Sequence, residues 1–154
     1  GLAACLLLLG AALGTQGCGG KGVGSGAPVR YGKASGGIGV KTARTQLGKP
    51  YKYGGHSPRT GFDCSGLIVW SYKQYGVSVP RKASDQAKYG KVVKKSQLKQ
   101  GDIGVFRVSG AWHTGIYTGS NKFIHSPSSG KTIREDNINA EYWRRRYYSA
   151  RRIL

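Results

Sequence analysis

A helix with a cysteine in its first turn is predicted by the stretch Gly61-Phe62-Asp63-Cys64-Ser65-Gly66-Leu67-Ile68-Val69-Trp70-Ser71-Tyr72. Asp63 is a good N-cap, because its carboxylate can accept hydrogen bonds from the unpaired backbone N–H groups of the first turn. Gly76 supplies a left-handed stop. The residues that recur at helical spacing, and so predict one inward stripe, are Cys64, Leu67, Ile68, Ser71, Tyr72 and Tyr75.

The position of Cys64 favours a reactive thiol. At a helix N-terminus the macrodipole and the free N–H groups stabilise the thiolate, so the pKa of Cys64 is expected to fall. The alternative is that Cys64 is a small buried hydrophobe, as many lone cysteines are. The helix by itself leaves both interpretations open.

The N-terminal segment has the pattern of an export signal. Residues 2–13 form an uncharged apolar run, which is too short to span a bilayer and suits the h-region of a signal peptide. The sequence Gly14-Thr15-Gln16-Gly17-Cys18 resembles a bacterial lipoprotein cleavage box, although Thr15 stands where that box has Leu. We therefore expect residues 1–17 to be a signal peptide truncated at its start, and Cys18 to be lipidated. The alternative is a secreted protein cleaved nearby.

Lipidation of Cys18 would place the protein at a membrane and would make Cys18 the first residue of the mature chain. Gly19, rather than Asp, after the cysteine is typical of lipoproteins sorted to an outer membrane facing the periplasm. Residues 18–38 are rich in glycine and read as a tether, followed by one domain at residues 39–154. Cys64 would then be the only thiol of the folded domain. An exported protein that can form no internal disulfide keeps such a cysteine for chemistry.

The chain is strongly basic. It has 25 Lys and Arg against 6 Asp and Glu, a formal net charge of +19, and all of this charge lies after Cys18. Such a surface favours an anionic partner, namely cell-wall polymers, lipid headgroups or nucleic acid. Export makes nucleic acid the least favoured of the three.

The order of the predicted elements indicates an α+β fold. Helices come first and strands later, which favours helices packed on an antiparallel sheet of about five to six strands. The predicted helices are Val40–Leu47, the Cys64 helix, a short helix capped by Ser84, and a turn at Ala140–Arg145. The predicted strands are Ile103–Val108, Trp112–Thr118, Lys122–Ser126, Lys131–Arg134 and Tyr147–Leu154.

Two of the three histidines lie on strands that are predicted to pair. A loop at Gly119-Ser120-Asn121, closed by Thr118 paired with Lys122, places His125 diagonal to His113 on the same sheet face. The neighbouring register that keeps them on one face would put them directly opposite, and a slip by one residue would separate them. His56 lies in a polar loop and is expected to be solvated. A zinc site is the alternative for the pair, but no local ligand spacing supports it.

Six short motifs follow one another along the chain, namely Pro50-Tyr51-Lys52-Tyr53-Gly54-Gly55, Gly61-Phe62-Asp63-Cys64-Ser65-Gly66-Leu67, Pro80-Arg81, Gly101-Asp102, His113-Thr114-Gly115-Ile116-Tyr117 and Phe123-Ile124-His125. In this order they resemble the motifs of NlpC-type cell-wall peptidases, a papain-like family. The ending, from Tyr142-Trp143 to Ala150-Arg151-Arg152, resembles small lipoprotein endopeptidases of Gram-negative envelopes. Thr114 departs from the commoner aliphatic residue of the family.

The resemblance implies roles for individual residues. Cys64 would be the nucleophile, His113 the general base and His125 the residue that orients it. Tyr51 would help to bind the oxyanion together with the backbone N–H of Cys64. The residues expected to contact substrate are Asp63, Ser65, Ser84 and Trp112, with a plain helix cap as the alternative for Asp63.

The implied activity is hydrolysis of peptidoglycan stem peptides, at the bond between D-glutamate and a diamino acid or at a cross-link. No cofactor and no metal are expected, and the protein is expected to be a monomer. Two alternatives remain open. One is a cationic module that binds the wall without turnover, and the other is a related Cys–His amidase or acyltransferase.

Overall fold

Four helices and a six-stranded sheet form the described part of the chain. The structure, a computed structural model, describes residues 36–154, so the predicted signal peptide, Cys18 and nearly all of the tether lie outside the described residues. The helices are α1 (Gly37–Arg44), α2 (Cys64–Lys73), α3 (Ala83–Gln86) and the later α4 (Glu141–Arg146), with a 3-10 turn η1 (Lys95–Gln97). The strands of the main sheet are β3 (Lys91–Val93), β4 (Ile103–Val108), β5 (Ala111–Gly119), β6 (Lys122–His125), β7 (Arg134–Asn137) and β8 (Tyr147–Arg152).

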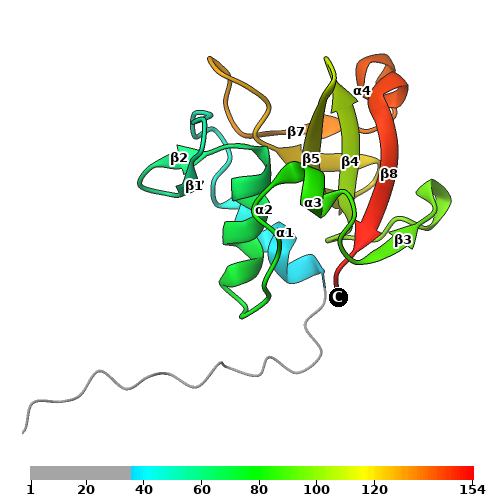
Figure 1. Ribbon diagram of the computed structural model, residues 1–154, viewed down its shortest axis with the longest axis horizontal. Coiled ribbons are helices and arrows are strands. Elements are labelled where there is room, and N and C mark those ends of the chain that lie inside the picture. The colour runs from blue at the N-terminus through cyan, green and yellow to red at the C-terminus, as the bar shows by residue number, and fades with distance from the viewer. Residues whose placement is uncertain (1–35) are drawn as a thin grey trace, which may run out of the picture.

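The main sheet is antiparallel throughout, in the order β3-β8-β4-β5-β6-β7. A separate two-stranded ribbon, β1 (His56–Ser57) and β2 (Gly61–Phe62), precedes α2. Helices α1, α2 and α3 all contact β5, and α4 contacts β4 near the start of β8 (Figure 1). The predicted α+β arrangement of N-terminal helices on an antiparallel sheet is confirmed. No helix within residues 36–154 is long and apolar enough to cross a membrane.

Helix α2 begins and ends as its sequence predicts. Asp63 is the N-cap, and its Oδ1 accepts a hydrogen bond of 2.7 Å from the N–H of Gly66. Gly76, just beyond the helix, has φ +72°, the left-handed conformation that glycine adopts without steric cost. The predicted stripe is buried at Leu67, Ile68, Ser71 and Tyr72, and its ends at Cys64 and Tyr75 are partly exposed.

Apolar side chains cover both faces of the sheet. On the face toward α1 and α2 the core includes Leu67, Ile68, Ile116 and Ile124. On the other face Trp143 of α4 closes a second, mainly aromatic cluster with Phe106, Tyr117, Phe123 and Ile138. Each fully buried side chain of this size contributes roughly 1.5–3 kcal/mol. The helix that carries Cys64 and the strands that carry His113 and His125 are therefore backed by packed apolar layers.

The β5–β6 hairpin keeps the predicted register with a different turn. Ile116 pairs with Ile124 and Tyr117 with Phe123, as predicted, but Gly119 rather than Thr118 pairs with Lys122. The turn is the two-residue segment Ser120–Asn121, with φ +51° and +58°. Two left-handed residues match the twist of a hairpin. The extra residue, Thr118, forms a bulge that restores the register.

Other boundaries differ from the prediction. Helix α1 begins and ends three residues earlier than predicted. Its Gly39 lies against the Tyr72 ring, which a Cβ there would meet at 3.0 Å. The predicted strand Lys131–Arg134 is instead Arg134–Asn137. Residues 131–133 pair with residues 48–51, through Tyr51 N–H to Lys131 O (2.9 Å) and the Pro50–Thr132 bridge. The sequence did not predict β1, β2 or β3.

Candidate active site

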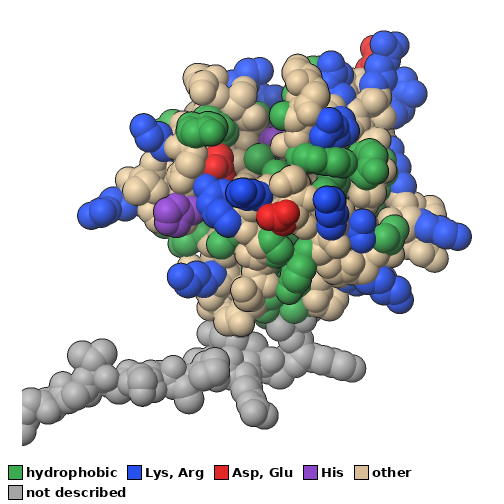
Figure 2. All heavy atoms as spheres, in the orientation of Figure 1, with side chains coloured by type: hydrophobic (Ala, Val, Ile, Leu, Met, Phe, Trp, Pro, Cys, Tyr) green, Lys and Arg blue, Asp and Glu red, His purple; other side chains and the backbone are tan. Residues whose placement is uncertain are grey.

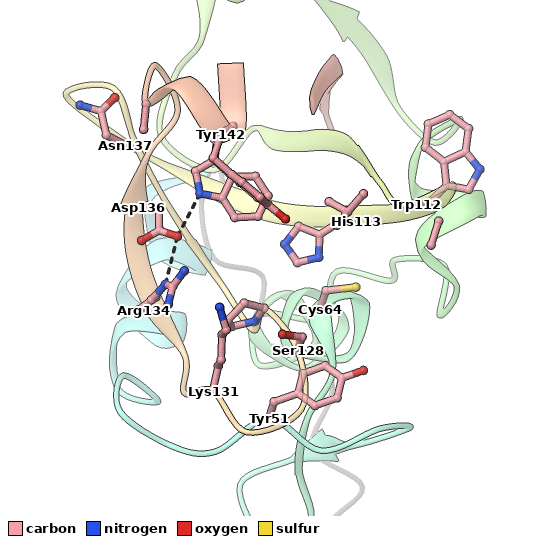
Figure 3. Close-up of a pocket in the computed structure, with 15 residues that line it drawn as sticks. Tyr51, Cys64, Trp112, His113, Ser128, Lys131, Arg134, Asp136, Asn137 and Tyr142 are labelled. Carbon is pink, nitrogen blue, oxygen red and sulfur yellow. Dashed lines mark hydrogen bonds and ion pairs between the residues drawn. The ribbon is translucent and has the colours of Figure 1, made fainter. Parts of the chain in front are cut away.

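Cys64 and His113 line the same pocket, which has a volume of about 540 Å³ (Figure 3). Cys64 is the first residue of α2, and His113 lies near the start of β5. Of the other residues predicted for the site, Tyr51 and Trp112 line the pocket, and His125 lies behind His113. The predicted substrate contacts Asp63, Ser65 and Ser84 do not line it.

Three side chains behind Cys64 form a hydrogen-bonded chain. Asp136 Oδ2 lies 2.9 Å from His125 Nε2, and His125 Nδ1 lies 2.8 Å from His113 Nε2. A carboxylate can only accept, so Nε2 of His125 carries its proton and Nδ1 is a bare acceptor. Nε2 of His113 must then be the donor. The remaining nitrogen, Nδ1 of His113, is left without a proton, and Figure 3 shows it turned toward Cys64. This is the tautomer that a general base requires.

Asp136, at the head of this chain, was not among the predicted site residues. It is held in place because its Oδ2 also accepts from Arg134 Nε and from Trp143 Nε1, each at 3.0 Å. Burial alone would favour the neutral acid. The hydrogen bonds from His125, Arg134 and Trp143 outweigh it and hold the pKa of Asp136 well below its usual range. The carboxylate is therefore ionised when it orients His125.

The aromatic cluster fixes both imidazole rings. The indole of Trp143 stacks on His113, with 5.4 Å between ring centroids and 21° between planes, and meets His125 edge-on at 4.9 Å. Burial lowers the pKa of His113 to about 3, and repulsion from a protonated His125 adds to the effect. Burial also lowers the pKa of His125, against the opposing pull of Asp136. Both histidines are thus neutral in the resting site at pH 7.

The expected fall in the pKa of Cys64 is wrong for this resting structure. Burial raises the pKa of the thiol, and hydrogen bonding from Thr114 and Ser65 lowers it by less. The helix N-terminus does not compensate for the lost hydration of a thiolate. The pair Cys64–His113 is therefore neutral at rest.

A buried polar link joins the strand that carries His113 to the helix that carries Cys64. The hydroxyl of Thr114 donates to Gln86 Oε1 at 2.8 Å, and Gln86 Nε2 donates to the carbonyls of Ser65 (3.1 Å) and Pro80 (2.8 Å). Thr114 and Gln86 are both fully buried. The departure at Thr114 thus supplies the hydroxyl that Gln86 binds, where an aliphatic residue would leave the amide oxygen unpaired.

Asp63 serves the helix and an ion pair. Besides capping α2, its two oxygens face Arg81, with Nη2–Oδ2 2.7 Å and Nη1–Oδ1 2.9 Å, and Arg81 also donates to Ser65 Oγ at 2.8 Å. This group braces the first turn that carries Cys64. Ser84 is not a helix cap, since α3 begins at Ala83 with Lys82 as its N-cap. Substrate contacts by Asp63, Ser65, Ser84 and Trp112 stay predictions.

Tyr51 lines the pocket together with Cys64, and its role at the oxyanion stays a prediction. Burial raises the pKa of its hydroxyl, and a negative charge on Cys64 as thiolate or on Asp63 raises it further, so the phenol keeps its proton at neutral pH. Cys64 is the first residue of α2, and the N–H of that position has no acceptor within the helix. A phenol and this N–H are suitable donors to a developing oxyanion. Within residues 36–154, no group of three or more His, Cys, Asp or Glu residues could hold a metal ion.

The NlpC/P60 family profile matches residues 48–152, which is most of the chain and includes every residue of this site. The chain belongs to the NlpC/P60 family. The resemblance inferred from the six motifs is thereby confirmed.

Curated NlpC/P60 relatives include three bacterial enzymes. The chain is 44% identical over 115 residues to murein DD-endopeptidase MepH of Escherichia coli, covering 71% of this chain and 42% of that protein. It is 43% identical over 110 residues to the E. coli murein DD-endopeptidase MepS (70% and 57%), and 39% identical over 119 residues to gamma-DL-glutamyl hydrolase of Bacillus subtilis (74% and 29%). The chain thus spans between 29% and 57% of the lengths of these relatives.

Solved NlpC/P60 structures share the fold. The chain superposes on an NlpC/P60 family protein from Bacillus cereus with a TM-score of 0.73 at 32% identity, covering 79% of this chain and 41% of that one. A lipoprotein-like NLP/P60 protein from Staphylococcus aureus gives 0.71 at 31% identity, covering 84% and 44%. The predicted papain-like fold is confirmed.

The buried neutral histidines make stability depend on pH. The folded-state pKa of His113 lies far below that of an unfolded histidine, so between these values the unfolded chain binds more protons, and acid destabilises the fold. Between pH 7 and pH 5 this one group is expected to lower the free energy of unfolding by about 2 kcal/mol.

Urea titrations at the two pH values should show His113→Gln losing less stability on acidification than wild type. His56→Gln, which changes an exposed histidine, should behave as wild type. Equal losses in all three proteins would contradict the assignment.

Proposed function

We propose that this protein is a cysteine endopeptidase that hydrolyses the stem peptides of peptidoglycan, at the bond between D-glutamate and a diamino acid or at a cross-link. The observation that carries the proposal is the chain Asp136–His125–His113, which turns an unprotonated Nδ1 toward Cys64 in an open pocket. The names of the relatives support the substrate class, since two are murein DD-endopeptidases and one is a gamma-DL-glutamyl hydrolase.

The geometry leads to acyl transfer through the thiol. His113 Nδ1 takes the proton of Cys64 as the sulfur attacks the peptide carbonyl, and Tyr51 with the Cys64 N–H stabilises the oxyanion. The imidazolium then gives its proton to the leaving amine, and a thioester remains on Cys64. Water, deprotonated by His113, cleaves that thioester and regenerates the thiol. Asp136 stabilises the imidazolium through His125 in both steps.

Digestion of purified sacculi tests this function. Wild-type protein should release soluble peptides whose masses identify the bond cut, and Cys64→Ala should release none. Binding to sacculi with no released fragment would favour the wall-binding module instead. Release of glycan-linked or lipid-linked amide products in place of stem peptides would favour the amidase or acyltransferase alternative.

Location and surface charge extend the proposal. We place the enzyme in the cell envelope, anchored through acylated Cys18 to an outer membrane facing the periplasm, which labelled fatty acid should show on wild type and not on Cys18→Ala. The charge of +19 suits anionic wall polymers and not nucleic acid in this compartment. Figure 2 shows Lys and Arg side chains spread over the visible face, with few acidic side chains among them.

A further inference from the structure

Lys131 points into the catalytic pocket from the segment between β6 and β7 (Figure 3). Its backbone is anchored on both sides, since its N–H donates to Ser128 O at 3.1 Å and its carbonyl accepts from Tyr51 N–H at 2.9 Å. The same segment continues into the Pro50–Thr132 bridge. The base of the side chain is thus fixed beside Tyr51, and only its flexible stem is free to move.

The ammonium group of Lys131 has no partner within residues 36–154. No hydrogen bond or ion pair to it is formed there, although it lines the same pocket as the carboxylate of Asp136. Asp136 cannot serve, because His125, Arg134 and Trp143 already converge on its Oδ2. The negative charge of Asp136 and the positive charge of Arg134 cancel in their ion pair. The charged groups that line the pocket therefore leave one positive charge uncompensated, on Lys131.

We propose that Lys131 binds a free carboxylate of the stem peptide and makes that carboxylate a requirement for good substrates. The inference rests on the proposed function and deepens it. An unpaired ammonium on a flexible stem is a compact positive charge. It can bind an anionic group in many orientations, without the fixed geometry that a guanidinium imposes. Two sources share this chemistry, the α-carboxylate of a γ-linked D-glutamate and a carboxylate of the diamino acid. A solvated surface lysine with no ligand is the simpler explanation that the experiment has to exclude.

Synthetic stem peptides distinguish the sources. The free peptide is compared with two forms, each amidated at one of the two carboxylates. Lys131→Gln should raise KM for the free peptide by about 10-fold or more and change kcat by less than about 3-fold, because a charge-assisted hydrogen bond of substrate binding is lost. The amidated form on which Lys131→Gln has no effect identifies the carboxylate that Lys131 binds. Lys131→Arg should recover part of the loss.

Lys122→Gln is the matched control, since Lys122 is exposed like Lys131 and carries the same charge, but lies at the start of β6, outside the pocket. If both variants raise KM equally, or if Lys131→Gln affects all three peptides alike, the proposal is wrong. Calorimetric binding to Cys64→Ala gives a second readout. The free peptide should bind more tightly than one amidated form, and Lys131→Gln on this background should remove the difference. If the wild-type protein does not turn over any of the peptides but the calorimetry shows this binding pattern, the proposed function is wrong and the carboxylate site stands.

Discussion

Changing Cys64 to Ser is expected to lower kcat/KM on a stem peptide by at least about 10³-fold, because the nucleophile and its base act as a unit. Serine is nearly isosteric with cysteine, but its hydroxyl is far harder to deprotonate. A neutral His113 that has already lost part of its basicity to burial cannot offset that difference. The measurement is steady-state hydrolysis of a soluble stem peptide, followed by release of the free amine.

The fold should survive this change. Thermal unfolding and binding to sacculi should match wild type, since one atom is exchanged at a partly exposed position. Cys18→Ser, which changes a cysteine outside the proposed site, should leave turnover of the soluble peptide unaltered. Activity of Cys64→Ser within about tenfold of wild type would remove Cys64 from its role.

The change Asp136→Asn should produce the second largest loss, about 10²-fold or more in kcat with little change in KM. The amide nitrogen of the new Asn side chain can donate to His125 Nε2, which moves the proton of His125 to Nδ1. That nitrogen would then donate to His113 Nε2, and His113 would carry its proton on Nδ1, facing Cys64. A histidine protonated at that atom cannot accept the thiol proton.

Two measurements separate this effect from a loss of structure. The rate of Cys64 alkylation by iodoacetamide, followed against pH, should shift to higher pH in Asp136→Asn because the base is lost. Glu135→Gln neutralises the adjacent carboxylate, which pairs with Arg44 at 2.8 Å and does not line the pocket, and should keep wild-type kcat. Equal kcat values for the two variants would show that Asp136 does not set the tautomer.

Local sequence was sufficient for the nucleophile helix and for the histidine hairpin. The cap at Asp63, the apolar spacing of Leu67, Ile68 and Tyr72, and the stop at Gly76 are all interactions within a few residues of each other. The register that brings His113 and His125 together follows from the alternation of side chains along two strands joined by a short turn. In the turn itself, the bulge at Thr118 was not predicted.

Residues that depend on more distant pairing were missed. Asp136 joins the site only because β7 begins at Arg134, and that start follows from residues 131–133 pairing with residues 48–51, far away in the sequence. A predicted strand at Lys131–Arg134 ended before Asp136. A search for a carboxylate diagonal to His125 on the next strand was the signal that could have found it. Gln86 likewise reaches Thr114 from 28 residues away.

The sequence by itself determined the α+β class, the family, and the placement of a cysteine at a helix start and of two histidines on one hairpin, because each rests on periodicity or on contiguous motifs. Only the tertiary structure decided the protonation pattern of the site. The direction of the chain Asp136–His125–His113 needs three strands in register, and the raised pKa of Cys64 needs the burial that the packed layers create. Desolvation depends on all neighbouring atoms at once, and no local pattern of residues encodes it.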